Sequence, residues 1–150
     1  AVGYTESMPR RMKVGELMSS ELVTLAEDDT LAHAQRCMAR GRIRHLPVVR
    51  EGRLIGLITH RDLLTASFSS FADVDHHEQR RVFVTVPVAE LMHRDVLTVP
   101  ADTPVAEAAR ILLANSFGCL PVVDETGVLL GILTESDFVL AAKIDRLDPT

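Results

Sequence analysis

The sequence is poor in aromatic residues, in cysteine and in long apolar runs. It has no Trp, one Tyr and only 4% aromatic residues, so the stacking platforms typical of base-binding surfaces are scarce. Any core must therefore be built from aliphatic side chains and Met. The two cysteines, Cys37 and Cys119, have no metal-ligand spacing and make no disulfide framework, and we expect both to be reduced and buried.

Membrane and nucleic-acid partners are disfavoured by apolar patterning and by charge. No stretch approaches the roughly 18 consecutive apolar residues that cross a bilayer, and residues 1–13 lack the apolar core of a signal peptide. We therefore expect a cytoplasmic protein. The net charge of −5, from 16 basic and 21 acidic residues, opposes indiscriminate binding to nucleic acid.

An internal repeat organises the chain. Three blocks recur in the same order, the first two 74 residues later and the third 75 residues later. The pairs are Val14–Met18 with Val88–Met92, Leu46–Val49 with Leu120–Val123, and Gly56–Asp62 with Gly131–Asp137. The extra residue, Thr126, falls between apolar runs, where an insertion predicts a hairpin turn.

Each copy has the periodicity of a β-α-β-β-α unit. In the first copy this predicts a short strand at 22–25 and a helix from 31 to about 41. Two strands, 46–49 and 54–59, follow and are joined at Gly52, and a closing helix begins after Thr59. In the second copy the same order predicts 96–99, 105 to about 115, two strands joined by 124–127, and a helix from Thr134 toward Arg146.

The fold class that follows is α+β, with two pseudo-symmetric repeats packed as one module. One copy of about 50 residues buries too little surface to be comfortably stable alone. We predict a first repeat at 14–64 and a second repeat at 86–146, joined by an exposed polar linker at 65–85. The N-terminal tail is 1–13 and the C-terminal tail is 147–150.

These repeated blocks resemble the cystathionine β-synthase (CBS) domain, and their pairing resembles a Bateman module. The resemblance rests on an apolar-Pro-Val-Val strand, a hairpin and Gly-apolar-apolar-Thr-x-x-Asp, each occurring twice in register. It implies a regulatory module that binds AMP, ATP, S-adenosylmethionine or a similar adenosyl ligand in clefts between the repeats, with no required cofactor. It also implies a side-by-side homodimer, for which we expect interface residues in Val88–Met92 and Ala108–Ala114.

The Thr-x-x-Asp motifs allow two interpretations. An Asp can accept hydrogen bonds from both ribose hydroxyls with a Thr beside it, and the resemblance assigns Asp62 and Asp137 to ribose, next to Thr59 and Thr134. The same spacing also describes a capping box at a helix start, which local sequence alone favours.

Basic side chains for a phosphate occur in the first copy only. The basic group expected to supply it consists of Arg42, Arg44, His45, His60 and Arg61. The counterparts in the second copy are Ser116, Gly118, Cys119, Glu135 and Ser136. The alternative for the arginines Arg36, Arg40, Arg42 and Arg44 is a solvated helix end.

Apolar residues around the repeated strands are candidates for an adenine slot. On the resemblance we place Val23, Leu97, Ile43 and Phe117 there, with ordinary core as the alternative. Pro47 and Pro121 lack a donor and suggest strand edges beside each cleft, or edge protection alone. Gly56 and Gly131 indicate close approach, either of a ligand or of a partner element.

Catalytic and metal sites are disfavoured. His45 and Cys119 are equivalent under the repeat and could form a nucleophilic pair, but no orienting third group or oxyanion loop is visible. His76 and His77, near Asp73 and Asp75, lie in polar sequence without defined ligand geometry.

We therefore expect a non-enzymatic sensor that regulates an effector protein. Three alternatives stay open. The first is a ligand-free dimerisation scaffold, the second is a nucleic-acid binder that uses the basic strip 40–53, and the third is an enzyme.

Overall fold

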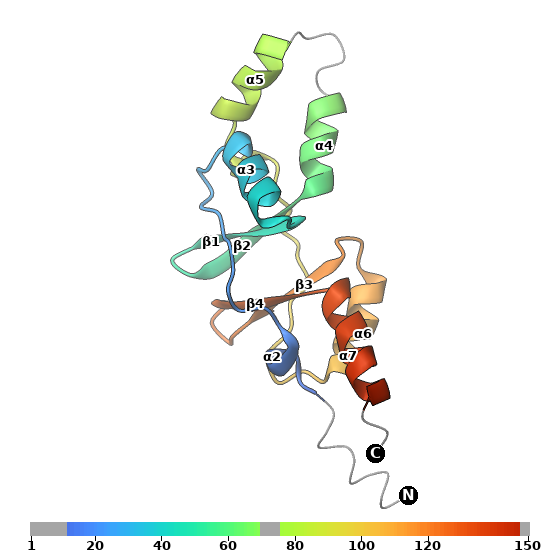
Figure 1. Cartoon of the computed structure of the whole chain (residues 1–150). Coiled ribbons are helices and arrows are strands. Elements are labelled where there is room, and N and C mark those ends of the chain that lie inside the picture. The colour runs from blue at the N-terminus through green and yellow to red at the C-terminus, as the bar shows by residue number, and fades with distance from the viewer. Residues whose placement is uncertain (1–11, 70–75, 148–150) are drawn as a thin grey trace, which may run out of the picture. The chain divides into compact units, whose positions relative to one another are not determined.

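The computed structural model describes residues 12–69 and 76–147 (Figure 1). Its contacts divide the chain into two compact units. We call Val23–Val96 the central unit, and the residues up to Leu22 together with those from Leu97 onward the terminal unit. Each unit has a strand pair and helices, which confirms the predicted α+β class with two repeats.

The same kinds of element occur in both units. The central unit contains α3 (Leu31–Gly41), β1 (His45–Arg50), β2 (Arg53–Thr59), α4 (His60–Ser69), α5 (His76–Thr85) and the 3-10 helix η2 (Val88–Glu90). The terminal unit contains α2 (Val14–Leu17), α6 (Val105–Ala114), β3 (Cys119–Val123), β4 (Leu129–Thr134) and α7 (Glu135–Leu147). Within the described chain, no helix is long and apolar enough to cross a membrane.

Each sheet is an antiparallel hairpin. Pro47 is opposite Leu57 in the first hairpin, and Pro121 is opposite Ile132 in the second, with a register shift in each after the following Val. Gly52 has a φ of 80° in its turn, which confirms the conformation expected there.

The predicted first strands are wrong in extent. Of residues 22–25 and 96–99, only Leu25 and Val99 form parallel bridges, to Val48 and Val122 respectively. Leu25 donates its N–H to the Pro47 carbonyl at 2.9 Å, but a proline offers no N–H in return. The ladder therefore does not extend along this edge of the hairpin.

The compact units are not the contiguous sequence repeats. Val14 is fully buried in the terminal unit, in a core with Val99, Leu120 and Leu133. Its repeat equivalent, Val88, is fully buried in the central unit. The Val-x-Glu-Leu-Met block that begins each repeat thus packs with the hairpin of the other repeat.

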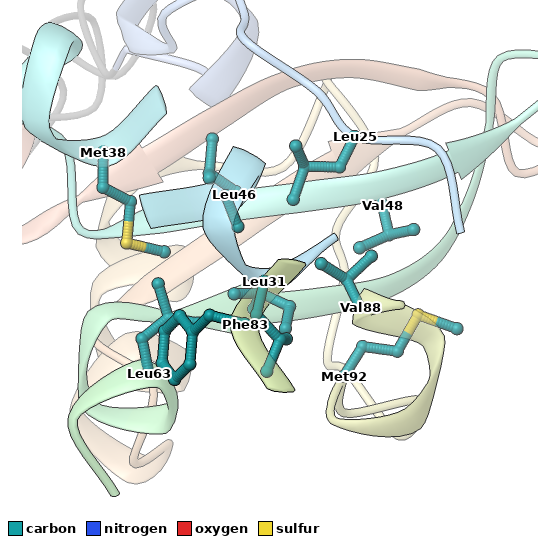
Figure 2. Packing of buried hydrophobic residues seen from close by; sticks show 11 residues of the cluster. Leu25, Leu31, Met38, Leu46, Val48, Leu63, Phe83, Val88 and Met92 are labelled. Carbon is teal, nitrogen blue, oxygen red and sulfur yellow. The ribbon is translucent and has the colours of Figure 1, made fainter. Parts of the chain in front are cut away.

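The predicted linker is partly helical and partly buried. Residues 65–69 continue α4, and α5 lies at the other end of the segment, whereas Asp73 and Asp75 fall outside the described residues. Phe83 of α5 is only 7% exposed and packs in the core of the central unit with Leu31 and Leu63 (Figure 2). Phe83 belongs to a short apolar run, 82–84, that is preceded by polar and charged residues. For that reason composition alone indicated an exposed linker.

The expected dimer interface is also corrected in part. Val88 is buried and Met92 is 8% exposed, so neither offers an outer surface. In α6, Ala108 and Leu112 face the core, but Leu113 is 86% exposed. An amphipathic helix presents neighbouring residues to different environments, so the apolar run Ala108–Ala114 divides between core and surface.

Two glycines allow a turn to lie directly on a strand. A Cβ at Gly56 would overlap the Met92 sulfur and lie 3.1 Å from the His93 carbonyl oxygen. A Cβ at Gly131 would overlap the Met18 sulfur and lie 2.9 Å from the Ser19 carbonyl oxygen. The structure therefore favours close approach of a partner element as the reason for glycine at both positions.

We expect Gly56→Ala and Gly131→Ala each to destabilise the chain by about 1–3 kcal/mol, because the added methyl must displace backbone as well as a Met side chain. Urea unfolding measures this difference. Gly41→Ala, in the last turn of α3, is the control: its Cβ meets only the Ile43 side chain, at 3.3 Å, and we expect it within about 1 kcal/mol of wild type. Equal unfolding midpoints for all three variants would contradict the packing argument.

We expect Phe83→Ala to cost about 3–5 kcal/mol, because it empties a core position. The adjacent Val84 is 52% exposed, so Val84→Ala should change the free energy of unfolding by less than about 0.5 kcal/mol. Calorimetry compares the two. A Phe83 variant as stable as the Val84 variant would show that α5 does not contribute to the core.

Candidate functional site

The start of α4 is a complete capping box. The Thr59 N–H donates to Asp62 Oδ2 at 2.8 Å, and the Asp62 N–H donates to Thr59 Oγ1 at 3.2 Å. Thr59 is 8% exposed and ends β2, so the strand delivers the cap directly to the helix. The capping interpretation is confirmed here, and it leaves the second carboxylate oxygen of Asp62 available to another partner.

That second oxygen is taken by His93. Its Nε2 lies 2.8 Å from Asp62 Oδ1, and the two side chains are 40% and 15% exposed. His93 is held there by a backbone bridge in which His93 and Leu57 exchange two hydrogen bonds of 2.9 Å. Both oxygens of Asp62 therefore have partners within the central unit.

The equivalent site at the start of α7 is more open. The Thr134 N–H donates to Asp137 Oδ2 at 2.8 Å, and the Thr134 hydroxyl lies 3.4 Å from the same oxygen. Asp137 is half-buried. Among the residues that the structure describes, Thr134 alone hydrogen-bonds to this carboxylate, so Oδ1 remains an unused acceptor there.

A groove of about 510 Å³ lies in the central unit, lined by the second half of α3, the segment that follows it and α4. It brings together four residues of the sequence analysis, Arg42, Ile43, Arg44 and His60. The rest of the lining is Gln35, Met38, Ala39, Leu63, Leu64 and Ser67. Exposed basic side chains beside the buried Met38 and Leu63 suit an amphipathic anion.

The remaining predicted basic residues do not line this groove. Arg61 is exposed in the first turn of α4, and His45 is half-buried at the start of β1, where it has an interaction partner. The sequence therefore indicated five basic residues for a phosphate, and three of them, Arg42, Arg44 and His60, line the groove.

The apolar candidates separate into exposed and covered residues. Val23 is 45% exposed and Leu97 is 54% exposed, at equivalent positions of the two repeats, so the core alternative is wrong for both. Ile43 and Phe117 are half-buried, and the Phe117 N–H donates to Asn115 Oδ1 at 2.7 Å. Exposed aliphatic side chains at matched positions are consistent with apolar contact surfaces.

Pro47 and Pro121 are fully buried in β1 and β3. Their carbonyls accept the N–H groups of Leu25 and Val99, at 2.9 Å and 3.1 Å. Because both rings are buried, neither is exposed to a ligand in this structure.

Chemistry at the cysteines and metal ligation have little support. Burial raises the pKa of the Cys119 thiol to about 12, so it stays protonated and poorly nucleophilic at neutral pH. Cys37 is only half-buried, which corrects the prediction that both thiols are buried; its Sγ lies 3.6 Å from His33 Nε2. No group of three metal-ligating side chains occurs within residues 12–69 and 76–147.

The basic strip 40–53 is partly neutralised. Arg50 forms a bidentate ion pair with Glu27, with N–O distances of 2.6–2.9 Å. This pairing lowers the pKa of the Glu27 carboxyl through the Arg50 hydrogen bond and removes one cation from the surface proposed for nucleic acid.

Sequence reasoning missed His93 as a partner of Asp62. His93 lies within a repeated segment, and shifting it by 74 residues gives Ser19. Because His and Ser differ in size and chemistry, this difference at matched positions of the repeat was the signal that could have identified His93. Arg42 adopts a left-handed φ of 52° as the C-cap of α3, which turns the chain toward the groove that it lines.

The two thiols should differ in reactivity. At pH 8 we expect a disulfide reagent to modify Cys37 in the folded chain and Cys119 only after denaturation. The thiolate is the reacting species, and burial keeps the Cys119 pKa, at about 12, well above this pH. Counting released thiol chromophore with and without urea checks this, and Cys37→Ser identifies the fast site. Rapid modification of both cysteines without urea would contradict it.

Comparison with known proteins agrees with this geometry. The family model for the CBS domain matches residues 14–69 and 88–143. A CBS domain-containing protein of Dictyostelium discoideum is 35% identical over 140 residues, covering 93% of this chain and 96% of that protein. Inosine-5′-monophosphate dehydrogenase of Thermoplasma acidophilum is 31% identical over 137 residues, but the chain spans only 25% of that enzyme.

Solved CBS pairs have the same fold. The CBS-pair protein CBSX2 of Arabidopsis thaliana is 30% identical with a TM-score of 0.78, covering 90% of this chain and 97% of that one. CBSX2 has also been solved in complex with AMP, at 29% identity and a TM-score of 0.76, with coverage of 90% and 98%. The CBS domain pair of protein MJ0100, solved with 5′-methylthioadenosine and S-adenosyl-L-methionine, is 26% identical with a TM-score of 0.72 and coverage of 88% and 96%. With two family matches in tandem and one strand pair in each unit, the chain belongs to the CBS domain family as a CBS pair, a Bateman module.

Proposed function

We propose that the chain is a regulatory module that binds an adenosine-containing ligand and catalyses no reaction itself. The observation that carries this proposal is the Thr-x-x-Asp helix start, in which a backbone N–H orients the carboxylate at 2.8 Å in both units. A carboxylate fixed through one oxygen presents the other as a preorganised acceptor, which suits the hydroxyls of a ribose.

The groove in the central unit would suit a phosphorylated form of such a ligand if the Thr-x-x-Asp site of that unit received it. Arg42, Arg44 and His60 line it, and arginine is suited to phosphate because its guanidinium can donate two parallel hydrogen bonds. Ile43 and Leu63 provide the apolar lining that a nucleobase would require.

The relatives support the ligand class. CBSX2 was solved with AMP, and the CBS pair of MJ0100 with 5′-methylthioadenosine and S-adenosyl-L-methionine. The compounds share an adenosine moiety and differ in the 5′ substituent. We accordingly assign the adenosine moiety as the recognised group.

Ligand binding would act through a conformational or dimer rearrangement. A ligand shifts such an equilibrium only by its differential affinity for the two states. Each unit has exposed apolar side chains that a homodimer would cover: Leu64 on α4 in the central unit, and Leu113 on α6 with Val139 and Leu140 on α7 in the terminal unit. We propose that this rearrangement is transmitted to an effector protein.

Thermal unfolding tests the proposal with AMP, ADP, ATP, S-adenosylmethionine, NAD and cyclic dinucleotides. A bound adenosine compound at about 100 times its dissociation constant should stabilise the chain by about 2.7 kcal/mol. The double variant Asp62→Asn, Asp137→Asn should lose this shift, because the amide keeps one oxygen for the Thr N–H but replaces the second acceptor with a donor.

The matched control is Asp28→Asn, Asp102→Asn, which removes the same charge from exposed, repeat-equivalent positions and should keep the ligand shift. If no adenosine compound stabilises the wild-type chain, the sensor proposal is wrong. A ligand-independent dimer in that case would favour the scaffold alternative, which the exposed apolar residues also suit.

A further inference from the structure

We propose that His93 closes one of the two Thr-x-x-Asp sites, so that the chain binds a single adenosine-containing ligand, through Asp137. This inference rests on the proposed function and specifies which of its two sites is used. His93 acts here as a specificity-determining residue, because it competes for the carboxylate that would otherwise receive the ribose.

His93 and Ser19 occupy equivalent backbone positions in the two units. His93 exchanges two hydrogen bonds of 2.9 Å with Leu57, and Ser19 exchanges two of 3.0 and 3.1 Å with Ile132. In each unit this bridge adjoins the glycine whose missing side chain lets the turn approach the strand. The two backbones therefore present residues 93 and 19 in the same way, and the side chain makes the difference.

The carboxylates face different partners as a result. Asp62 and Asp137 each use Oδ2 for the Thr N–H, at 2.8 Å in both units. Asp62 Oδ1 is also 2.8 Å from the His93 imidazole. A serine side chain is too short to substitute for that ring, and within the described parts of the chain no hydrogen bond joins Ser19 to Asp137.

A ribose diol at Asp62 must displace this imidazole or share Oδ1 with it. The hydrogen bond to a carboxylate that is only 15% exposed is of the strong, charge-assisted kind, and ligand binding would have to replace or weaken it. At Asp137 the diol meets an acceptor with no imidazole to remove. We expect at least a tenfold difference in affinity between the two sites.

Reciprocal substitutions test this by exchanging the two side chains. The chains are wild type, His93→Ser, Ser19→His and the double exchange Ser19→His, His93→Ser. Isothermal titration calorimetry with AMP, and in parallel with 5′-methylthioadenosine, measures the number of ligands bound per chain. We expect one bound ligand per chain for wild type, two for His93→Ser, none for Ser19→His and one for the double exchange. A site counts as gained or lost when its affinity changes at least tenfold.

Ser19 is exposed, so the introduced imidazole does not have to enter the core, and a thermal melt of each ligand-free variant checks folding. If Ser19→His does not fold, the wild-type and His93→Ser stoichiometries still decide the question. Two ligands on the wild-type chain, or one on His93→Ser, would overturn this inference and leave the proposed function standing. No binding of either compound to wild type and His93→Ser would overturn both.

Discussion

The approach of a short turn to a glycine in the second strand of each hairpin is the constraint on which both units depend. At Gly56 the turn brings Met92 and His93 against the strand, where a single Cβ would overlap them. The same contact carries Val88 into the core and His93 to Asp62. Packing and site geometry are thus linked, since the hydrogen-bonded bridge of Leu57 with His93 lies directly beside Gly56, where the missing Cβ makes room for the turn.

The two units share the same Thr-x-x-Asp helix start and differ in the side chains around it. Both carboxylates are oriented by the same 2.8 Å capping bond. The basic groove residues and His93 occur in the central unit, whereas α7 begins with Glu135. The repeat supplies two copies of one framework, and its surface positions can differ because they do not disturb the core of either unit.

The elements with strong local signals were predicted well. Periodicity located α3 and α6, and turn chemistry located both hairpins, because helices and tight turns depend on nearby residues. The strand predicted at 22–25 was reduced to one bridge by Pro47, which lies distant in sequence. The helix containing Phe83 was hidden by its polar neighbours, since its burial comes from contacts with Leu31 and Leu63.

By itself, the sequence determined the repeat, the two hairpins, the helix starts and the residue types available at each Thr-x-x-Asp motif, because all of these follow from local pattern and register. Only the tertiary structure decided that each Val-x-Glu-Leu-Met block packs with the other repeat's hairpin, and that His93 reaches Asp62 from 31 residues away. Such pairings depend on how the chain returns on itself in three dimensions, and no local propensity encodes which distant side chain meets a given carboxylate.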